Sequence, residues 1–195
     1  MAGLLLLDPA ERVGTLFTDD RELAGQVAGS LHGLGLFAPF PLAAHAEPFR
    51  VLRGPAGPED AAHPFRHAVR RTRPEEYPRV GRLLHEIEGR LNPRWLDGVP
   101  PSEGCLQVEY GGELAGAGWV SVVGAHARLH SLAVRPRYRR LGIATDLVRA
   151  RKIWAYQHGA RSVLSEIAAG NTGSLVPSER AGLSAIGEIF LTRLP

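Results

Sequence analysis

The segment LAVRPRYRRLGIATDLV (residues 132–148) decides the fold. It begins as an apolar strand that ends at Val134, places four arginines among the next six residues, and continues as a helix that begins near Gly142. The first turn of a helix presents unpaired N–H groups and a partial positive charge, and both bind anions. Gly142 and Ala144 let a ligand approach that backbone closely. The segment therefore predicts a pyrophosphate-binding turn, with a basic, solvated start of a helix as the alternative.

The composition narrows the class of protein. The 195 residues are 44% apolar and 22% charged, which is ordinary for a globular chain of one domain or one domain plus a small lobe. The longest early apolar run, Leu4 to Leu7, is too short for a signal peptide or a membrane span. A single cysteine, Cys105, excludes an internal disulfide and favours a reducing compartment. We therefore expect a cytoplasmic protein that does not act at a membrane.

The net charge of +3 is unevenly distributed. Residues 1–65 contain four arginines and eight acids, a balance of −4, so residues 66–195 carry +7. A basic cluster of this kind suits nucleic acid, an acidic protein or a phosphate-bearing cofactor. Because the charge gathers at the predicted turn, where a single aromatic residue, Tyr138, gives no repeated alternation with basic residues, we expect no nucleic-acid partner. Lys152 is the only lysine, an arginine preference that indicates bacterial-like genomic composition.

The first 53 residues predict a small β-α-β lobe. Its expected elements are a strand, a helix and a strand, over 13–17, 19–34 and 49–53. Asp19 and Glu22 are predicted to cap the helix. The Gly- and Pro-rich segment 54–65 predicts a linker, and residues 66–195 are predicted to form the main domain.

The main domain shows alternating strand and helix patterns. Thr72 and Glu75 form a predicted capping box for a helix whose apolar stripe runs from Val80 to Leu91. Gly111 and Gly112 are typical of a two-residue hairpin turn. The remaining predicted elements are strands over 65–71, 105–110, 113–123, 126–134, 161–167 and 185–192, and helices over 142–158 and 171–181. This order predicts a mixed α/β fold with a mostly antiparallel central sheet flanked by helices.

Two segments resemble the GCN5-related N-acetyltransferase (GNAT) superfamily. RRLGIA at 139–144 resembles the core of its acetyl-CoA signature, Arg/Gln-x-x-Gly-x-Gly/Ala. NTGSLVPSERAGL at 171–183 resembles the family's Asn-x-x-Ser…Glu-Arg-x-Gly-Phe segment, and the order of elements from residue 66 onward also agrees. The resemblance implies an enzyme that moves acetyl from acetyl-CoA to a primary amine by direct attack in a ternary complex.

The resemblance also implies roles for the residues that bind the cofactor. The strand backbone before the turn would pair with the pantetheine arm, the N–H groups of the turn would hold the pyrophosphate, and Asn171 would lie near the thioester. The residues implied in binding are Leu132, Ala133, Val134, Arg139, Arg140, Leu141, Gly142, Ile143, Ala144, Asn171 and Ser174. We expect no metal, since His63, His67 and Cys105 lack metal-ligand spacing.

Two residues compete for the role of general base. His130 lies on the strand that enters the turn, where we expect it on the same face as Leu132 and Val134. Glu166 precedes Asn171 by five residues, a spacing that resembles family members with a glutamate base. The alternatives are a half-buried strand histidine and a carboxylate paired with an arginine. His130 is the first choice because the ordinary pKa of histidine, about 6.5, needs little tuning.

The general acid departs from the family pattern. The family often has a tyrosine seven residues after the asparagine, and that position is Ser178 here. This substitution motivates an alternative function, a non-enzymatic CoA-binding or regulatory module of the same fold.

Three further expectations concern the acceptor, the assembly and the N-terminal lobe. The resemblance implies that the amine acceptor, a small molecule or a peptide, binds around residues 75–103. It also implies that edge strands can pair two copies into a homodimer. GLGLFA (33–38) echoes RAGLSA (180–185), which suggests that the lobe is a degenerate acetyltransferase half.

Overall fold

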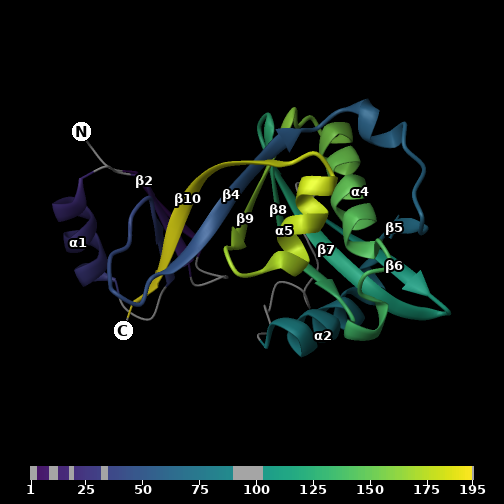
Figure 1. Cartoon of the computed structure of the whole chain (residues 1–195), viewed down its shortest axis with the longest axis horizontal. Helices are drawn as coiled ribbons and strands as arrows, with labels where there is room; N and C mark the ends of the chain where they lie inside the picture. Colours follow the sequence, from purple (N-terminus) through teal and green to yellow (C-terminus); the bar gives the residue numbers. More distant parts are fainter. Residues whose placement is uncertain (1–3, 9–12, 18–19, 32–34, 90–102, 195) are drawn as a thin grey trace. The chain divides into compact units, whose positions relative to one another are not determined.

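The computed structural model describes residues 4–8, 13–17, 20–31, 35–89 and 103–194 (Figure 1). The chain divides into two compact units. The smaller unit takes residues 1–51, 167–170 and 186–195, and the larger takes 52–166 and 171–185. Relative to the predicted division, the smaller unit also receives the C-terminal strand, and residues 54–65 belong to the larger unit.

The smaller unit contains a strand–helix–strand arrangement. Its elements are β1 (Leu4–Asp8), β2 (Val13–Phe17), α1 (Arg21–Ser30), β3 (Gly35–Ala38), the start of β4 (Glu47–Pro55) and most of β10 (Ser184–Arg193). β2 pairs in parallel with β3, while β1–β2 and β3–β10 are antiparallel. The first strand after the helix is Gly35–Ala38, a buried strand that the sequence pattern did not predict, and the predicted strand 49–53 lies within β4. Leu16, Ala24 and Leu36 form the core of this unit.

Helix α1 begins later than its sequence pattern predicts. The Asp20 carboxylate accepts hydrogen bonds from the backbone N–H groups of Glu22 and Leu23, at 2.9 and 3.0 Å. Asp20 is therefore the N-cap of α1, and the predicted partner Asp19 lies outside the described residues.

The larger unit is a mixed layer of strands and helices. Its elements are β5 (Val69–Arg71), α2 (Tyr77–Glu88), β6 (Glu103–Tyr110), β7 (Glu113–Val123), β8 (His126–Val134), α4 (Ile143–Gln157), β9 (Ser162–Ala168) and α5 (Thr172–Arg180), with short 3-10 turns η1 (Pro58–Ala61), η2 (Pro74–Glu76) and η3 (Pro136–Tyr138). The strand order is β9-β8-β7-β6-β5. Only the β8–β9 pair is parallel among the pairs of this order, so the predicted mostly antiparallel sheet is confirmed.

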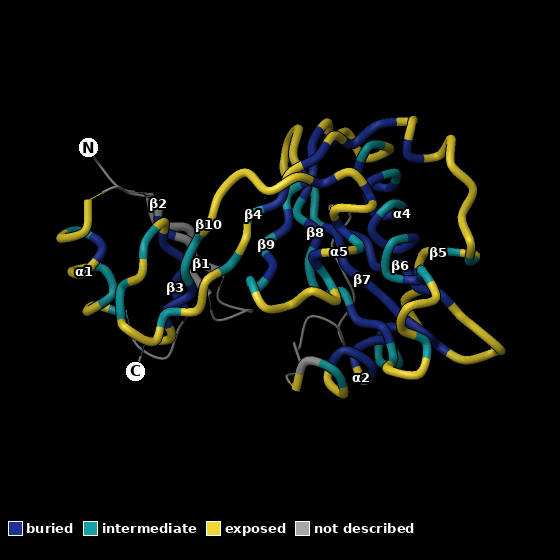
Figure 2. Tube along the Cα trace, viewed as in Figure 1, coloured by how far each residue is buried: buried dark blue, intermediate teal, exposed yellow. Residues whose placement is uncertain are grey.

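Helices cover both faces of this sheet (Figures 1 and 2). On one face α2 packs Tyr77 against Trp119 of β7, with ring centroids 5.5 Å apart, within a buried cluster that includes Cys105. On the other face lies α4, since a Cβ at Gly104 would meet the ring of Trp154. Neighbouring residues of a strand point to opposite faces of the sheet, so Gly104 faces α4 and Cys105 faces α2.

The predicted linker 54–65 is packed and not loose. A Cβ at Gly54 would lie 2.8 Å from the carbonyl oxygen of Gly182. Asp60 is buried and accepts a hydrogen bond from Lys152 Nζ at 2.6 Å. Sequence composition does not register these contacts, because their partners are distant in the chain.

No helix in the described part of the chain is long and apolar enough to span a membrane.

The start of α2 differs from the predicted Thr72–Glu75 capping box. Thr72 is buried and donates its hydroxyl to Gln107 Oε1 at 3.0 Å. Glu76 reaches back instead, because its Oε2 accepts from the backbone N–H of Arg73 at 3.0 Å. Both carboxylate oxygens of Glu76 also accept from the Arg70 guanidinium, at 2.5 and 2.7 Å.

Glu76→Gln is expected to lower the free energy of unfolding by about 1 kcal/mol at pH 7 and to have little effect near pH 2. The hydrogen bonds from Arg70 lower the pKa of Glu76 from 4.5 to about 2. The stabilisation is therefore complete above pH 4.5 and is lost as the pH falls toward 2. Chemical denaturation at neutral and acidic pH measures this difference. Glu75→Gln, at the exposed neighbouring carboxylate, is the control.

Candidate functional site

A bulge interrupts β8 at Ser131, shortly before the predicted turn. β8 pairs with β7 as Trp119–His130 and again as Ala117–Ala133, so one extra residue lies between these pairs. Ser131 takes up the irregularity with a φ of 49°, in the left-handed region. A residue of this kind bends the strand and disrupts the ladder locally.

The bulge changes which side chains share a face. His130 lies opposite Trp119, on the α2 face. Val134 faces α4 instead, since a Cβ at Gly116 would meet both Val134 and Ile143 side chains. The expectation that His130 shares a face with Val134 is therefore wrong, because the extra residue shifts the alternation of the strand.

The pairing of β8 with β9 is short. It covers His126–Arg128 against Ser162–Leu164. The next carbonyl, that of Leu129, accepts from the Ser165 hydroxyl at 3.0 Å. These β8–β9 pairs do not extend to Leu132, Ala133 and Val134. On the β9 side, the backbone of these three residues can therefore pair with an added strand. The Val134 carbonyl accepts from Arg139 Nε at 3.2 Å, so that group already has a partner within the chain.

The predicted turn ends in an open helix start. Gly142 is the N-cap of α4 with a φ of 97°, and no side chain among the described residues caps the first turn. Arg140, two residues earlier, has a φ of 63°. The segment Arg139–Ala144 thus bends sharply and presents the backbone N–H groups of α4 to solvent or to a ligand, as an anion site requires.

One arginine at this turn has no signal in the sequence. Arg66 lies over Gly142, where a Cβ would be 3.2 Å from Arg66 Cδ. Its segment is fastened to α4 by Asp146, whose Oδ2 accepts from the backbone N–H groups of Arg66 and His67 at 3.2 and 3.0 Å. His67 Nδ1 lies 2.9 Å from the same oxygen. The sequence placed Arg66 in the predicted strand 65–71, and no local pattern relates it to Gly142, so sequence reasoning missed its role at the turn.

An arginine of α4 also holds the segment that carries Arg66. Arg149 donates to the backbone carbonyls of Asp60 and Pro64, at 2.8 and 3.3 Å. Its guanidinium also lies 4.8 Å from the Phe65 ring centroid. Two side chains of α4, Asp146 and Arg149, therefore hold the segment that carries Arg66.

The basic cluster that precedes the turn is largely neutralised. Arg135 pairs with Glu86 at 2.7 Å, and Arg137 pairs with Glu113. These acids come from α2 and β7, so a local count of charge overlooked them. The positive charge left for a ligand at the turn comes from Arg139, Arg140 and Arg66.

Both candidate bases lie on the α2 face of the sheet. His130 Nε2 is 2.9 Å from Ser121 Oγ on β7. Glu166 Oε2 accepts from Arg128 Nε at 2.9 Å, and this carboxylate is partly exposed. Glu166 is thus paired with an arginine, which is the alternative to a catalytic role that the sequence left open.

Helix α5 contains the remaining predicted residues. Asn171 is its N-cap, and Asn171 Oδ1 accepts from the backbone N–H of Ser174 at 3.2 Å. This bond gives the Asn-x-x-Ser spacing a structural reason. Ser178 is buried on the same helix, which packs against α4.

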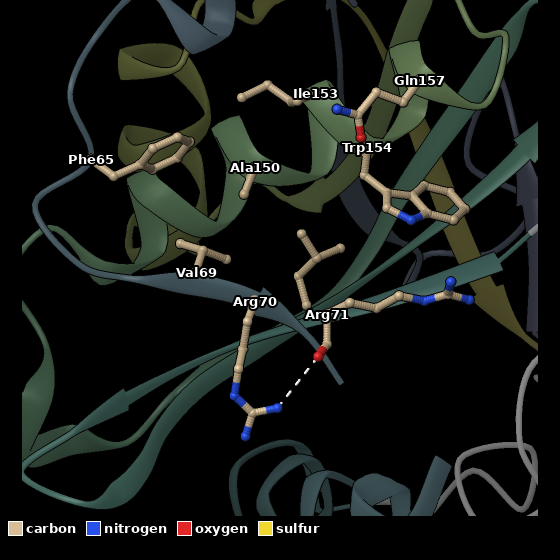
Figure 3. Close-up of a pocket in the computed structure, with 9 residues that line it drawn as sticks. Phe65, Val69, Arg70, Arg71, Ala150, Ile153, Trp154 and Gln157 are labelled. Atoms are coloured by element: carbon tan, nitrogen blue, oxygen red, sulfur yellow. Dashed lines mark hydrogen bonds between the residues drawn. The ribbon is translucent and has the colours of Figure 1, made fainter. Parts of the chain in front are cut away.

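Two other features lie apart from the turn. Burial raises the pKa of Cys105 to about 12, so this thiol stays protonated at neutral pH. A cavity of about 290 Å³ lies among Phe65, β5, Leu106 and the second half of α4, with Ala150, Ile153 and Trp154 on its helix side (Figure 3). No group of three metal-binding side chains occurs among the described residues.

Comparison with known proteins identifies the family. The sequence profile of the acetyltransferase (GNAT) family matches residues 64–175, more than half of the chain. The chain therefore belongs to the GNAT acetyltransferase family. No protein of curated function matched the sequence.

Solved structures share the fold at low sequence identity. A protein of Novosphingobium aromaticivorans assigned to the GNAT family is 21% identical, with a TM-score of 0.70, 95% of this chain covered and 85% of that one. The ribosomal-protein-S18-alanine N-acetyltransferase of Escherichia coli is 16% identical, with a TM-score of 0.55 and coverages of 64% and 91%. AAC(6′)-Iy in complex with the bisubstrate analogue CoA-S-monomethyl-acetylneamine is 18% identical, with a TM-score of 0.51 and coverages of 60% and 90%.

Proposed function

We propose that this chain transfers an acetyl group from acetyl-CoA to a primary amine by direct attack in a ternary complex. The observation that carries the proposal is the turn between β8 and α4. There the open first turn of the helix, the left-handed Gly142 and the side chain of Arg66 converge. Groups of positive potential that meet at one point are stabilised by an anion between them.

The co-substrate would lie along the bulged strand and the turn. The backbone of Leu132–Val134 would pair with the pantetheine arm, since it lies beyond the β8–β9 register. The N–H groups of Arg140–Ala144 would hold the pyrophosphate, with Arg66 and Arg139 as flanking cations. Asn171 and Ser174 would lie near the thioester. The occupant named in the AAC(6′)-Iy structure, a CoA conjugate, supports this choice of co-substrate.

His130 would be the general base. The amine must lose a proton as it attacks the acetyl carbonyl, and the hydrogen bond between His130 and Ser121 orients the imidazole for this step. Glu166 is the second candidate, but Arg128 already occupies one of its oxygens. The thiolate that leaves must gain a proton, and Ser178 is the residue at the position of the family's tyrosine.

Arg66→Gln is expected to raise the Kd for acetyl-CoA about tenfold, because a charge-assisted hydrogen bond to phosphate is lost. Calorimetric titration measures the change. Arg161→Gln is the matched control, since Arg161 is exposed and its guanidinium donates to the carbonyls of Gly159 and Ala160 and lies over the Tyr156 ring, away from the turn. Equal affinities for wild type and Arg66→Gln would remove Arg66 from the site and leave the rest of the proposal unaffected.

Thiol release with an amine panel tests the proposed reaction. The panel should include an alanine-terminated peptide and an aminoglycoside, because the E. coli relative and AAC(6′)-Iy bear names that point to these two kinds of amine. Thiol release with one member would support transfer and identify the acceptor class.

Ser178 favours a second candidate function, a CoA-binding module without catalysis. A serine reaches less far than a tyrosine, and Ser178 is buried. Saturable acetyl-CoA binding without thiol release from any amine would favour this alternative over the enzyme.

A further inference from the structure

A buried cation lies beneath the bulge of β8. Arg151, in the middle of α4, is 2% exposed. No carboxylate among the described residues lies within ion-pair distance of it, and burial lowers its pKa to about 10. Burying a charge without a counter-ion is costly, and an apolar residue usually serves stability better at such a position. Stability alone therefore does not explain why a guanidinium occupies this buried position.

The partners of Arg151 supply that explanation. Arg151 Nη1 donates to the carbonyls of Trp119 and His130, at 3.0 and 3.1 Å. These two residues form the last regular β7–β8 pair before the extra residue Ser131. Gly118 makes room for the contact, since a Cβ there would lie 3.0 Å from Arg151 Cζ.

Arg151 also joins the two parts of the proposed site. Its helix begins at Gly142, where the anion is expected to bind. Its guanidinium holds the carbonyl of His130, the proposed base. A third bond, from Arg151 Nε to the Leu147 carbonyl at 3.2 Å, fixes the side chain against its own helix. One rigid helix thus contacts both the phosphate-binding turn and the strand that carries the base.

We propose that Arg151 is a positioning residue that stabilises the β8 bulge and so orients His130 and the strand edge at Leu132–Val134 toward the first turn of α4. The roles of His130 and of the strand edge rest on the proposed function. The link between Arg151 and the bulge rests only on the contacts above.

The kinetic test compares Arg151→Met, Arg151→Lys and the control Arg161→Met, all well below their thermal midpoints. Arg151→Met is expected to lower kcat about 10- to 100-fold, because small displacements of a reacting group have effects of that size. Arg151→Lys keeps a donor and is expected to recover most of the loss, and Arg161→Met to behave as wild type. A wild-type kcat in folded Arg151→Met would overturn the positioning role, since a merely structural role would change only the midpoint.

A stability cycle with deletion of Ser131 tests the link to the bulge. The deletion removes the extra residue and leaves Gly118 opposite Leu132, with the flanking pairs unchanged. The thermal-midpoint loss caused by Arg151→Met is expected to fall to less than half in the deletion background. Equal losses in both backgrounds would overturn the link.

The two tests separate the inference from the proposed function. If Arg151→Met does not fold, Arg151→Gln, which removes the charge and shortens the side chain, is used in the same cycle with the deletion. If the wild type neither binds acetyl-CoA nor releases thiol, the proposed function fails, while the stability cycle still confirms or overturns the role of Arg151 at the bulge.

Discussion

Gly142→Glu is expected to abolish acetyl-CoA binding, with a Kd at least about 100-fold higher than that of the wild type. Gly142 has a φ of 97°, a conformation that costs other residues energy. A Cβ there would meet Arg66 Cδ at 3.2 Å, so a side chain displaces Arg66. The new carboxylate would also repel a phosphate and could take Arg66 as its own partner. Calorimetric titration with acetyl-CoA measures the loss.

Gly89→Glu is the matched control for Gly142→Glu. Gly89 ends α2 with a φ of 71°, and a Cβ there would meet no atom within 4 Å. It therefore imposes a similar backbone penalty away from the proposed site. Unchanged acetyl-CoA affinity in folded Gly142→Glu would contradict the assignment of the turn.

His130→Ala is expected to lower kcat by about 10²- to 10⁴-fold, the usual contribution of a general base. The KM for acetyl-CoA should change little, because the proposed binding contacts on β8 come from the backbone of Leu132–Val134. Steady-state kinetics with a responsive amine measures both quantities. Glu166→Gln is expected to have a smaller effect, since Arg128 already engages its carboxylate.

His126→Ala is the control for the histidine. His126 begins the same strand, and its Nδ1 lies 2.8 Å from Ser162 Oγ, so it matches His130 in residue type and in having a serine partner. We expect near wild-type turnover from it. Wild-type turnover in His130→Ala together with a large loss in Glu166→Gln would assign the base to Glu166.

Local signals in the sequence predicted several elements of the larger unit. The Gly111–Gly112 hairpin is present, with φ values of 60° and 79°. The helix expected over 142–158 spans Ile143–Gln157. Both depend on residues that are neighbours in the chain, so pattern and turn chemistry suffice to find them.

The missed features depend on contacts between distant segments. Arg66 lies over Gly142 because Asp146 and Arg149, both on α4, hold its segment. Glu86 and Glu113 neutralise Arg135 and Arg137 from other elements. No local pattern reports such partners, so the charge of the cluster was overestimated and the role of Arg66 was not seen.

The bulge explains the remaining error about the site. RLHSLAV reads as a regular strand, and a regular strand would place His130 on the face of Val134. Ser131 adopts a left-handed φ that serine rarely adopts, and Arg151, from another element, supports the neighbouring carbonyls. A conformation imposed by a buried side chain from a helix is not encoded in the strand itself.

Thiol release measured with and without a primary amine tests the central claim most directly. Cys105 is the only cysteine and is fully buried, so a thiol reagent reports released CoA with little background from the folded protein. Direct transfer predicts that thiol appears only when acetyl-CoA and an acceptor amine are both present, in step with the acetylated amine. A burst of thiol without any amine would contradict direct attack, and no thiol with every amine at saturating acetyl-CoA would contradict acetyl transfer itself.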